Sequence, residues 1–452
     1  MLKRALLAAA FIAVPVGAQD LPRNCNLVFT NTPATRLNLI KLPSGKYNTY
    51  SGGGVVGHCS GQNNQVTADS AEYYEEQGLL YLIGNVHYTE PRAKVDARRM
   101  TYFQSDDHLH AEGDVVGVFS NGSTMHGPVA DYYRATAQRP VSRLIAPNHP
   151  VFDIVQVDTT GRKAPEKAHV VANLVIMDGD SLTYASGQVQ LTRPDLVAKG
   201  DSAFLDGARN FARLMRSPSV EGKGDRQFTL TGDVIDIYSS QREIDRVVAA
   251  PHGHALSKDI ELVSDTIDLR FSENAVQHAT AWGPHRANAI APDREIIADS
   301  IDALLPGQRI REVHAIRKAF ANSVPDTATI ISAERDWMMG DTIVALFDSL
   351  KTGDTTSRPL VRRVIASVDA RSYFHTRSSN APKNRPSVNY VRGREITALF
   401  TTGKVSTVVV TDQAAGVYIE PVTASSTRTT LPVSPPTRAP ATPPAVGPRI
   451  KH

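Results

Sequence analysis

The stretch that decides the fold reads VTADSAEYY at residues 66–74 and continues as LYLIGNV at residues 80–86. Its first part contains a four-residue motif, here called the head, in which a small residue, an aspartate, a variable residue and an apolar residue follow one another, as in Ala68-Asp69-Ser70-Ala71. The chain repeats the head at Gly200-Asp201-Ser202-Ala203, Gly232-Asp233-Val234-Ile235, Ser264-Asp265-Thr266-Ile267, Ala298-Asp299-Ser300-Ile301 and Gly340-Asp341-Thr342-Ile343. Val95-Asp96-Ala97 is a weaker copy, and Gly393-Arg394-Glu395-Ile396 has arginine in place of the aspartate.

The spacing of the heads shows an internal repeat. Asp233, Asp265, Asp299 and Asp341 are 32, 34 and 42 residues apart, and each of the first three is followed 11, 14 and 16 residues later by apolar side chains. These are Ile244, Val247 and Ala249; Val276, Ala279 and Ala281; Ile310, Val313 and Ala315; and, after Arg394, Val405, Val408 and Val410. A repeat of roughly thirty residues is typical of stacked architectures, in which each unit buries its apolar face against its neighbours.

Each unit is predicted to form two short strands. Ile267 and Leu269 alternate with Thr266 and Asp268, which is the period of a half-buried strand. A polar turn follows, and then the second strand, in which the step of three from Ile244 to Val247 predicts a bend or bulge.

The N-terminal units carry another version of the second strand, with a glycine before a polar residue and a valine. Gly84-Asn85-Val86, Gly113-Asp114-Val115 and Gly187-Gln188-Val189 share this pattern. Glycine inside a strand indicates a bend or a close approach of two backbones. No long stretch has the 3.6-residue period of a helix, so we expect little helix.

The predicted fold is all-β, an elongated stacked β-jelly-roll or β-solenoid built from two-strand repeats. Residues 63–139 and 171–420 are expected to form an N-terminal and a C-terminal block of repeats, and residues 140–170 a loop or a seam between them. Residues 421–452 contain many prolines with Thr, Ser and Ala, so this tail is predicted to be disordered.

The N-terminus predicts export. Residues 1–18 combine two cations, a twelve-residue apolar stretch from Ala5 to Val16 and small residues before a cleavage point, as signal peptides do. We therefore expect the protein in the periplasm, with association with the outer membrane as a further option. In the lead-in segment, residues 19–62, an oxidising compartment favours a disulfide between Cys25 and Cys59, and two buried free thiols are the alternative.

Composition limits the classes of function. Of the 452 residues 41% are hydrophobic and 21% charged, with a formal net charge of +3, which fits an ordinary folded protein and gives no reason to expect nucleic-acid binding. Beyond the N-terminus no apolar run reaches the length of a membrane-spanning helix. We find no nucleophile elbow, phosphate loop or zinc-protease helix, so no enzyme, catalytic residue, metal or cofactor is predicted.

The alternation of residues 66–74, 80–86, 95–102 and 109–115 resembles the OstA-like (organic solvent tolerance) family, most clearly over residues 66–135. That family includes the periplasmic bridge protein of lipopolysaccharide transport and the N-terminal domain of the outer-membrane lipopolysaccharide translocon. This chain is much longer than a short bridge protein. The resemblance implies a non-enzymatic protein whose jelly-roll shields acyl chains of lipopolysaccharide or a similar envelope lipid, during transport or outer-membrane assembly, and whose open end strands pair with other OstA-like domains. The predicted groove residues are Leu82, Val86, Leu109, Ala111, Val115, Ile235, Ile237, Ile267, Leu269, Ile301 and Ile343.

Other interpretations stay open at this point. The chain could be an exported β-solenoid that binds or cleaves polysaccharide, or a structural surface solenoid with a filled core. The histidine pairs at residues 108–110 and 252–254 are expected on the solvent face, because two imidazoles are too few for a metal site. The head aspartates are expected to set turns by accepting a backbone N–H at the strand entrance, with a calcium ladder as the alternative, and the pair Asp106-Asp107 is expected in a solvated turn.

Overall fold

The computed structural model describes Cys25 and residues 27–155, 167–179, 181–223, 227–240, 243–257, 260–273, 275–348, 359–377, 382–401 and 404–421. The predicted signal peptide, residues 1–18, and all but the first residue of the predicted tail lie outside the described residues.

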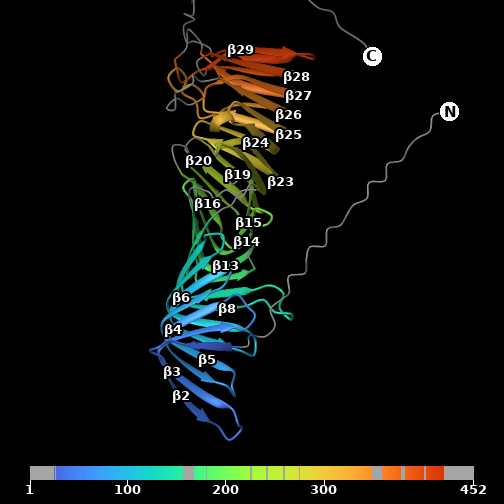
Figure 1. Ribbon diagram of the computed structural model, residues 1–452. Helices are drawn as coiled ribbons and strands as arrows, with labels where there is room; N and C mark the ends of the chain where they lie inside the picture. The colour runs from blue at the N-terminus through green and yellow to red at the C-terminus, as the bar shows by residue number, and fades with distance from the viewer. Residues whose placement is uncertain are drawn as a thin grey trace, which may run out of the picture.

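The described chain is all-β, as predicted. Thirty strands form antiparallel pairs in one continuous hydrogen-bonded network, and the only helical turn among the described residues is a 3-10 turn, Pro306–Gln308. Figure 1 shows the strands stacked into a long column, with β2 and β3 at one end and β28 and β29 at the other. Nowhere in the described ranges does a helix reach the length and apolarity needed to cross a membrane.

The strands of the N-terminal half are β1 (Leu27–Asn31), β2 (Arg36–Lys41), β3 (Tyr47–Cys59), β4 (Gln65–Tyr74), β5 (Leu79–Thr89), β6 (Ala93–Phe103), β7 (His108–Phe119), β8 (Thr124–Tyr133), β9 (Arg143–Pro147), β10 (Val151–Ile154), β11 (Ala168–Val171), β12 (Leu174–Asp178), β13 (Leu182–Thr192), β14 (Leu196–Asp206), β15 (Phe211–Met215) and β16 (Ser219–Gly222). Those of the C-terminal half are β17 (Phe228–Thr231), β18 (Val234–Ser240), β19 (Glu243–Ala250), β20 (Gly253–Ser257), β21 (Glu261–Ser264), β22 (Thr266–Ser272), β23 (Ala275–Ala291), β24 (Arg294–Leu304), β25 (Glu312–Ser323), β26 (Asp336–Phe347), β27 (Val361–Thr376), β28 (Ser387–Thr401), β29 (Lys404–Thr411) and β30 (Ala415–Ile419).

The strands of ten or more residues bend and contribute to two sheets. Residues 65–67 of β4 pair with residues 87–89 of β5 in the first sheet, and residues 70–74 of β4 pair with residues 79–83 of β5 in the second, with a register shift between them. The same shift recurs between β13 and β14, between β23 and β24, and in each pair from β24 to β28. The bends join the two sheets along one long edge, here called the ridge, and the turns of both sheets meet along the opposite edge, here called the mouth.

In the middle of the column the bends become breaks between shorter strands. The first sheet continues from β14 through β16, β17, β20 and β21 to β23, and the second from β14 through β15, β18, β19 and β22 to β23. Because β14 and β23 belong to both paths, these ten strands close a hydrogen-bonded ring around the interior.

The heads lie at the ridge. Four of them lie within a strand, as Asp69 does in β4, whereas Asp233 and Asp265 directly precede β18 and β22, at a strand entrance as predicted. In β4 the buried positions step by three across the bend, from Ala68 to Ala71, whereas in β5 they step by four, from Leu82 to Val86. A step of four agrees with strict alternation, whereas a step of three would turn the rest of β4 to the opposite face in a straight strand. The bend in β4 therefore keeps the same face of the chain inside both sheets.

The predicted glycine bends are confirmed. Gly84 has φ +76° and Asn85 φ +44°, and Gly113 and Gly187 have φ +81° and +76°. At Gly84 an added Cβ would lie 2.3 Å from Oδ2 of Asp69, so the bend needs glycine both for its backbone angle and for the space that the head aspartate occupies.

The predicted bulge in the second strand of the C-terminal units is also confirmed. The register between β18 and β19 shifts at Asp245, between Ile244 and Val247, and an equivalent shift lies between Val276 and Ala279 of β23. A bulged residue explains how two positions three apart point to the same side.

Two predicted boundaries need correction. The lead-in segment, residues 19–62, contains β1, β2 and β3, and β3 already pairs with β4 as part of the stack. Residues 140–170, predicted as a loop or seam, contain β9 and β10, which pair with β12 and with β8 and β11. The polar residues that suggested a loop form a bend at the ridge, where Asn148 and His149 adopt φ +64° and +60°.

Candidate functional site

The interior between the two sheets contains every residue that the sequence assigned to a groove. All eleven are 8% exposed or less and belong to one continuous apolar cluster. Val86 and Val115 lie on the first sheet, and the other nine lie on the second. The structure therefore brings these residues together along one interior, mainly on one of its two walls.

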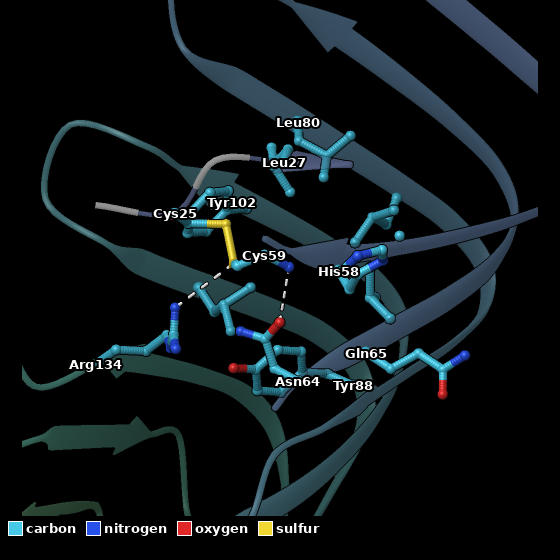
Figure 2. A pocket seen from close by; sticks show the side chains of 14 residues that line it. Cys25, Leu27, His58, Cys59, Asn64, Gln65, Leu80, Tyr88, Tyr102 and Arg134 are labelled. Carbon is cyan, nitrogen blue, oxygen red and sulfur yellow. Dashed lines mark hydrogen bonds between the residues drawn. A yellow bond between two sulfur atoms is a disulfide. The ribbon is translucent and has the colours of Figure 1, made fainter. Parts of the chain in front are cut away.

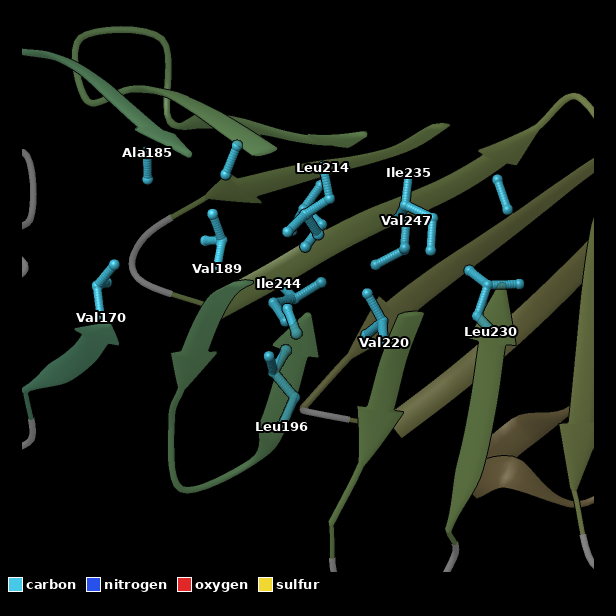
Figure 3. Close-up of a cluster of buried hydrophobic side chains, with 14 of the residues drawn as sticks. Val170, Ala185, Val189, Leu196, Leu214, Val220, Leu230, Ile235, Ile244 and Val247 are labelled. Carbon is cyan, nitrogen blue, oxygen red and sulfur yellow. The ribbon is translucent and has the colours of Figure 1, made fainter. Parts of the chain in front are cut away.

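The residues of the wall that faces them were not predicted. This wall consists of first-sheet residues that lie two positions before the small residue of a head or take the equivalent place in other strands: Val66, Val170, Leu196, Ala198, Val220, Leu230, Leu262 and Met338. Figure 3 shows Val170, Leu196, Val220 and Leu230 of this wall opposite Ala185, Leu214, Ile235 and Val247. The apolar residue two positions before each head could have identified this wall. The prediction began each repeat at the head, so these residues were not counted in it.

The interior is packed with side chains. Small residues such as Ala249, Ala281, Ala315 and Ala366 are fully buried in it. Two spaces between the walls, one near Leu80 and Tyr88 and one near Met100 and Met125, leave room for little more than a water molecule each. A bound chain would therefore have to separate the walls.

A disulfide and a buried ion cluster cross the mouth at the N-terminal end, and we call them the clasp. Cys25 and Cys59 are joined, with their Cα atoms 5.0 Å apart. Arg134, 7% exposed, lies beside them and contacts Asp107 at 3.1 Å and Glu90 at 3.4 Å. Figure 2 shows the Arg134 guanidinium directed at the disulfide. Glu90 belongs to a turn of the first sheet and Arg134 to the second, so the clasp ties the two turn edges together.

The electrostatic environment of the clasp favours the positively charged form of Arg134. Burial opposes the charge of Arg134, but interactions with Tyr88, Asp107 and Glu90 outweigh it and raise the pKa of the guanidinium. Burial also raises the pKa of Tyr132, whose hydroxyl donates to Glu90 at 2.5 Å. The expectation that Asp107 is solvated was wrong: it is 3% exposed, because its left-handed backbone, φ +53°, turns the carboxylate inward to Arg134.

The mouth is closed differently further along the column. Phe228 of the first sheet and Phe271 of the second meet across it with ring centroids 5.9 Å apart. Near the C-terminal end Lys404 of the second sheet contacts Asp326, in a loop of the first sheet, at 2.7 Å. Apolar packing alone is non-directional and can exchange partners, whereas an ion pair inside a buried cluster is specific to its partner.

The head aspartates bind the bends of the next strand. Asp69 accepts a hydrogen bond from Asn85 at 2.9 Å, and Asp265 accepts from the backbone N–H of His285 at 2.6 Å and pairs with its ring at 2.8 Å. At Asp265, which directly precedes β22, the bond from a backbone N–H agrees with the prediction. At Asp69 the prediction was wrong, because the donor is a side chain and the aspartate lies within β4. Among the described residues no group of three or more His, Cys, Asp or Glu side chains is placed to hold a metal ion.

The histidine pairs are on the outer face but differ in exposure. His108 is stacked between Phe103 and Tyr133, and its ring contacts Asp131 at 2.8 Å, so it is largely covered rather than solvated. His252 is exposed beside a head aspartate. These contacts are cross-strand pairs of the kind that stabilise a sheet.

Comparison with known proteins adds no relative. No model of a protein family matches the chain, and a search of curated proteins finds no significant match.

Proposed function

We propose that this protein is an exported, periplasmic member of the OstA-like group that shields lipid acyl chains between its two sheets, and so contributes to lipopolysaccharide transport or outer-membrane assembly. The observation that carries the proposal is the single apolar interior that runs from the first strands to β28, walled by two sheets that are joined covalently along the ridge. Such an interior takes up hydrocarbon and leaves sugars in water at the mouth.

The packed interior sets how lipid would be accommodated. An acyl chain would enter by separating the turns at the mouth and replacing contacts such as that between Phe228 and Phe271. Side-chain packing is lost and packing on the acyl chain is gained, so the net cost of opening is offset by roughly 0.8 kcal/mol per buried CH₂. The ridge, where strands pass from one sheet to the other, acts as the hinge.

The two ends of the column suit pairing with similar domains. At one end β1 and β2 both pair with β3, and at the other β29 and β30 both pair with β28, so each end presents one edge strand per sheet within the described chain. Leu39 of β2 and Val409 and Ile419 of the last strands are exposed. Unpaired strand edges template the addition of further strands.

Photo-crosslinking in cells tests the proposal with matched positions. A photoreactive residue at Leu82 faces the interior, and one at Tyr81, its neighbour in β5, faces outward. Ile267 and exposed Arg270 form a second pair in β22. Lipid adducts at both inner positions and at neither outer one support shielding. Equal labelling of inner and outer positions, or none at all, would contradict it.

A structural solenoid is a second candidate, and the packed interior favours it. This alternative predicts a column whose mouth never opens. Hydrogen exchange of the mouth-side turns, measured with and without vesicles that contain the envelope lipid, separates the two: faster exchange with lipid supports shielding, and unchanged exchange together with absent crosslinks supports the structural role.

A further inference from the structure

A hydrogen-bonded chain of serine, histidine and aspartate lies at the C-terminal end of the first sheet. Ser332 is in the loop between β25 and β26, Asp336 begins β26, and His375 is near the end of β27. The Ser332 Oγ lies 3.0 Å from Nε2 of His375, and Nδ1 of His375 lies 2.8 Å from Oδ1 of Asp336. No motif in the sequence predicts this arrangement, because the three residues meet only when the loop folds over the outer face of the sheet.

The surroundings fix the imidazole in one orientation. Its side chain is 2% exposed, and the backbone N–H of His375 also donates to Oδ1 of Asp336 at 2.7 Å. A carboxylate that accepts from Nδ1–H leaves the lone pair of Nε2 directed at the serine hydroxyl. Burial raises the pKa of Asp336, and the hydrogen bonds from His375 oppose that shift.

Ser332 is the reachable member of the chain. It is half-buried, and its neighbour Ile331 is 61% exposed. The backbone N–H of Glu334 lies 3.1 Å from its Oγ. This N–H donates to the Ser332 Oγ, as in a serine turn, and so holds the hydroxyl in its position beside His375.

We infer that Ser332, His375 and Asp336 form a serine hydrolase site that cleaves carboxylic esters. The order of contacts, nucleophile to Nε2 and Nδ1 to carboxylate, is the one that this chemistry requires, and it recurs on unrelated folds. The inference goes beyond the proposed lipid shielding, which includes no covalent step, and it departs from the expectation of a protein without enzymatic activity.

The reaction would run in two balanced steps. Ser332 Oγ attacks the ester carbonyl while its proton passes to Nε2 of His375, and the alkoxide leaves with that proton as an alcohol. Water then attacks the acyl-serine, gives a proton to Nε2, and the acid leaves as Oγ recovers a proton. Asp336 holds the imidazole and balances its charge without itself being protonated. Exposed Ile331, which directly precedes the nucleophile in the chain, favours esters of apolar acyl groups.

The test uses the full chain with p-nitrophenyl butyrate and with a fluorophosphonate, which phosphonylates activated serines. We expect the fluorophosphonate to label Ser332, as read by peptide mass, and Ser332→Ala to abolish both label and turnover. Ser105→Ala, at an exposed turn serine, is the control and should keep both. Asp336→Asn should lower kcat by a factor of about 10³–10⁴ with KM little changed.

A purely structural role, in which the three groups only hold the loop, predicts a different result. Ser332→Ala would then alter hydrogen exchange of residues 324–335, while the wild-type protein would carry no label on Ser332 and would hydrolyse the ester no faster than the variant. That outcome overturns the inference. Because the lipid crosslinks use other positions, it would leave the proposed shielding untouched, and loss of the crosslinks would leave this site untouched.

Discussion

Replacing Gly84 by alanine tests the reasoning about the ridge. At φ +76° an L-residue costs about 1–2 kcal/mol more than glycine. The new Cβ would also lie 2.3 Å from Oδ2 and 3.1 Å from Cβ of Asp69, so the aspartate must move and lose its 2.9 Å hydrogen bond from Asn85, about 0.5–1.5 kcal/mol. We expect a total loss of about 2–3 kcal/mol in the free energy of opening of β4 and β5.

A matched glycine separates the two contributions. Gly61 has φ +72° with no atom within 4 Å of an added Cβ, so Gly61→Ala should cost only the backbone part, about 1–2 kcal/mol. In an Asp69→Ala background the clash is absent, and Gly84→Ala should then cost as little as Gly61→Ala. This double-mutant cycle isolates the contact across the ridge.

Native-state hydrogen exchange of peptides from β4 and β5 is the appropriate assay, because a stacked repeat protein opens unit by unit rather than all at once. The reasoning would be refuted by equal costs for the two glycines, or by a cost of Gly84→Ala that Asp69→Ala leaves unchanged.

Three further outcomes follow from the clasp and the ridge. Replacing both Cys25 and Cys59 by serine should lower stability by about 4 kcal/mol for a separation of 34 residues, seen as a lower melting temperature that reductant no longer changes; a reductant-sensitive variant would contradict it. Arg134→Met leaves the buried carboxylates of Glu90 and Asp107 without their cation, so it should lower the free energy of unfolding by about 3–5 kcal/mol, as measured by urea denaturation. An unchanged free energy of unfolding would mean that the cluster is hydrated. The hydrogen bond to Asp265 raises the pKa of His285 above 6.5, so its stabilising effect is complete below pH 6.5 and disappears as pH rises through the folded-state pKa; NMR titration should show this raised pKa, and Asp265→Asn should abolish the shift.

The repeat and its strand pattern could be predicted because they rest on local spacing. Side-chain parity along Ile267 and Leu269, the step of three from Ile244 to Val247, and glycine at Gly84 each have one physical explanation that holds in the folded chain. These features depend on which way neighbouring residues point, and that information lies within a few positions of the sequence.

The bend at the head was beyond such reasoning. Ala68 and Ala71 three apart fit equally well the start of a strand after a turn or a corner within one strand, and only pairing with β5 distinguishes the two. Contacts made at long range were missed for the same reason. Asp107 meets Arg134 across 27 residues and Ser332 meets His375 across 43, with no spacing rule to connect them.

The opening of the mouth is the step on which lipid shielding depends, and it can be blocked. Phe228 and Phe271 face each other from opposite sheets at a ring separation of 5.9 Å, so cysteines at these two positions lie within reach of a short bis-maleimide. Linking Phe228→Cys to Phe271→Cys should abolish lipid adducts at Ile267, which lies deeper on the same strand as Phe271, while the unlinked variant keeps them. Adducts at Leu82, near the N-terminal end, should fall less, because only one point of a long mouth is closed. Full lipid labelling at Ile267 in the linked protein would mean that chains pass along the column from its ends instead of entering from the side.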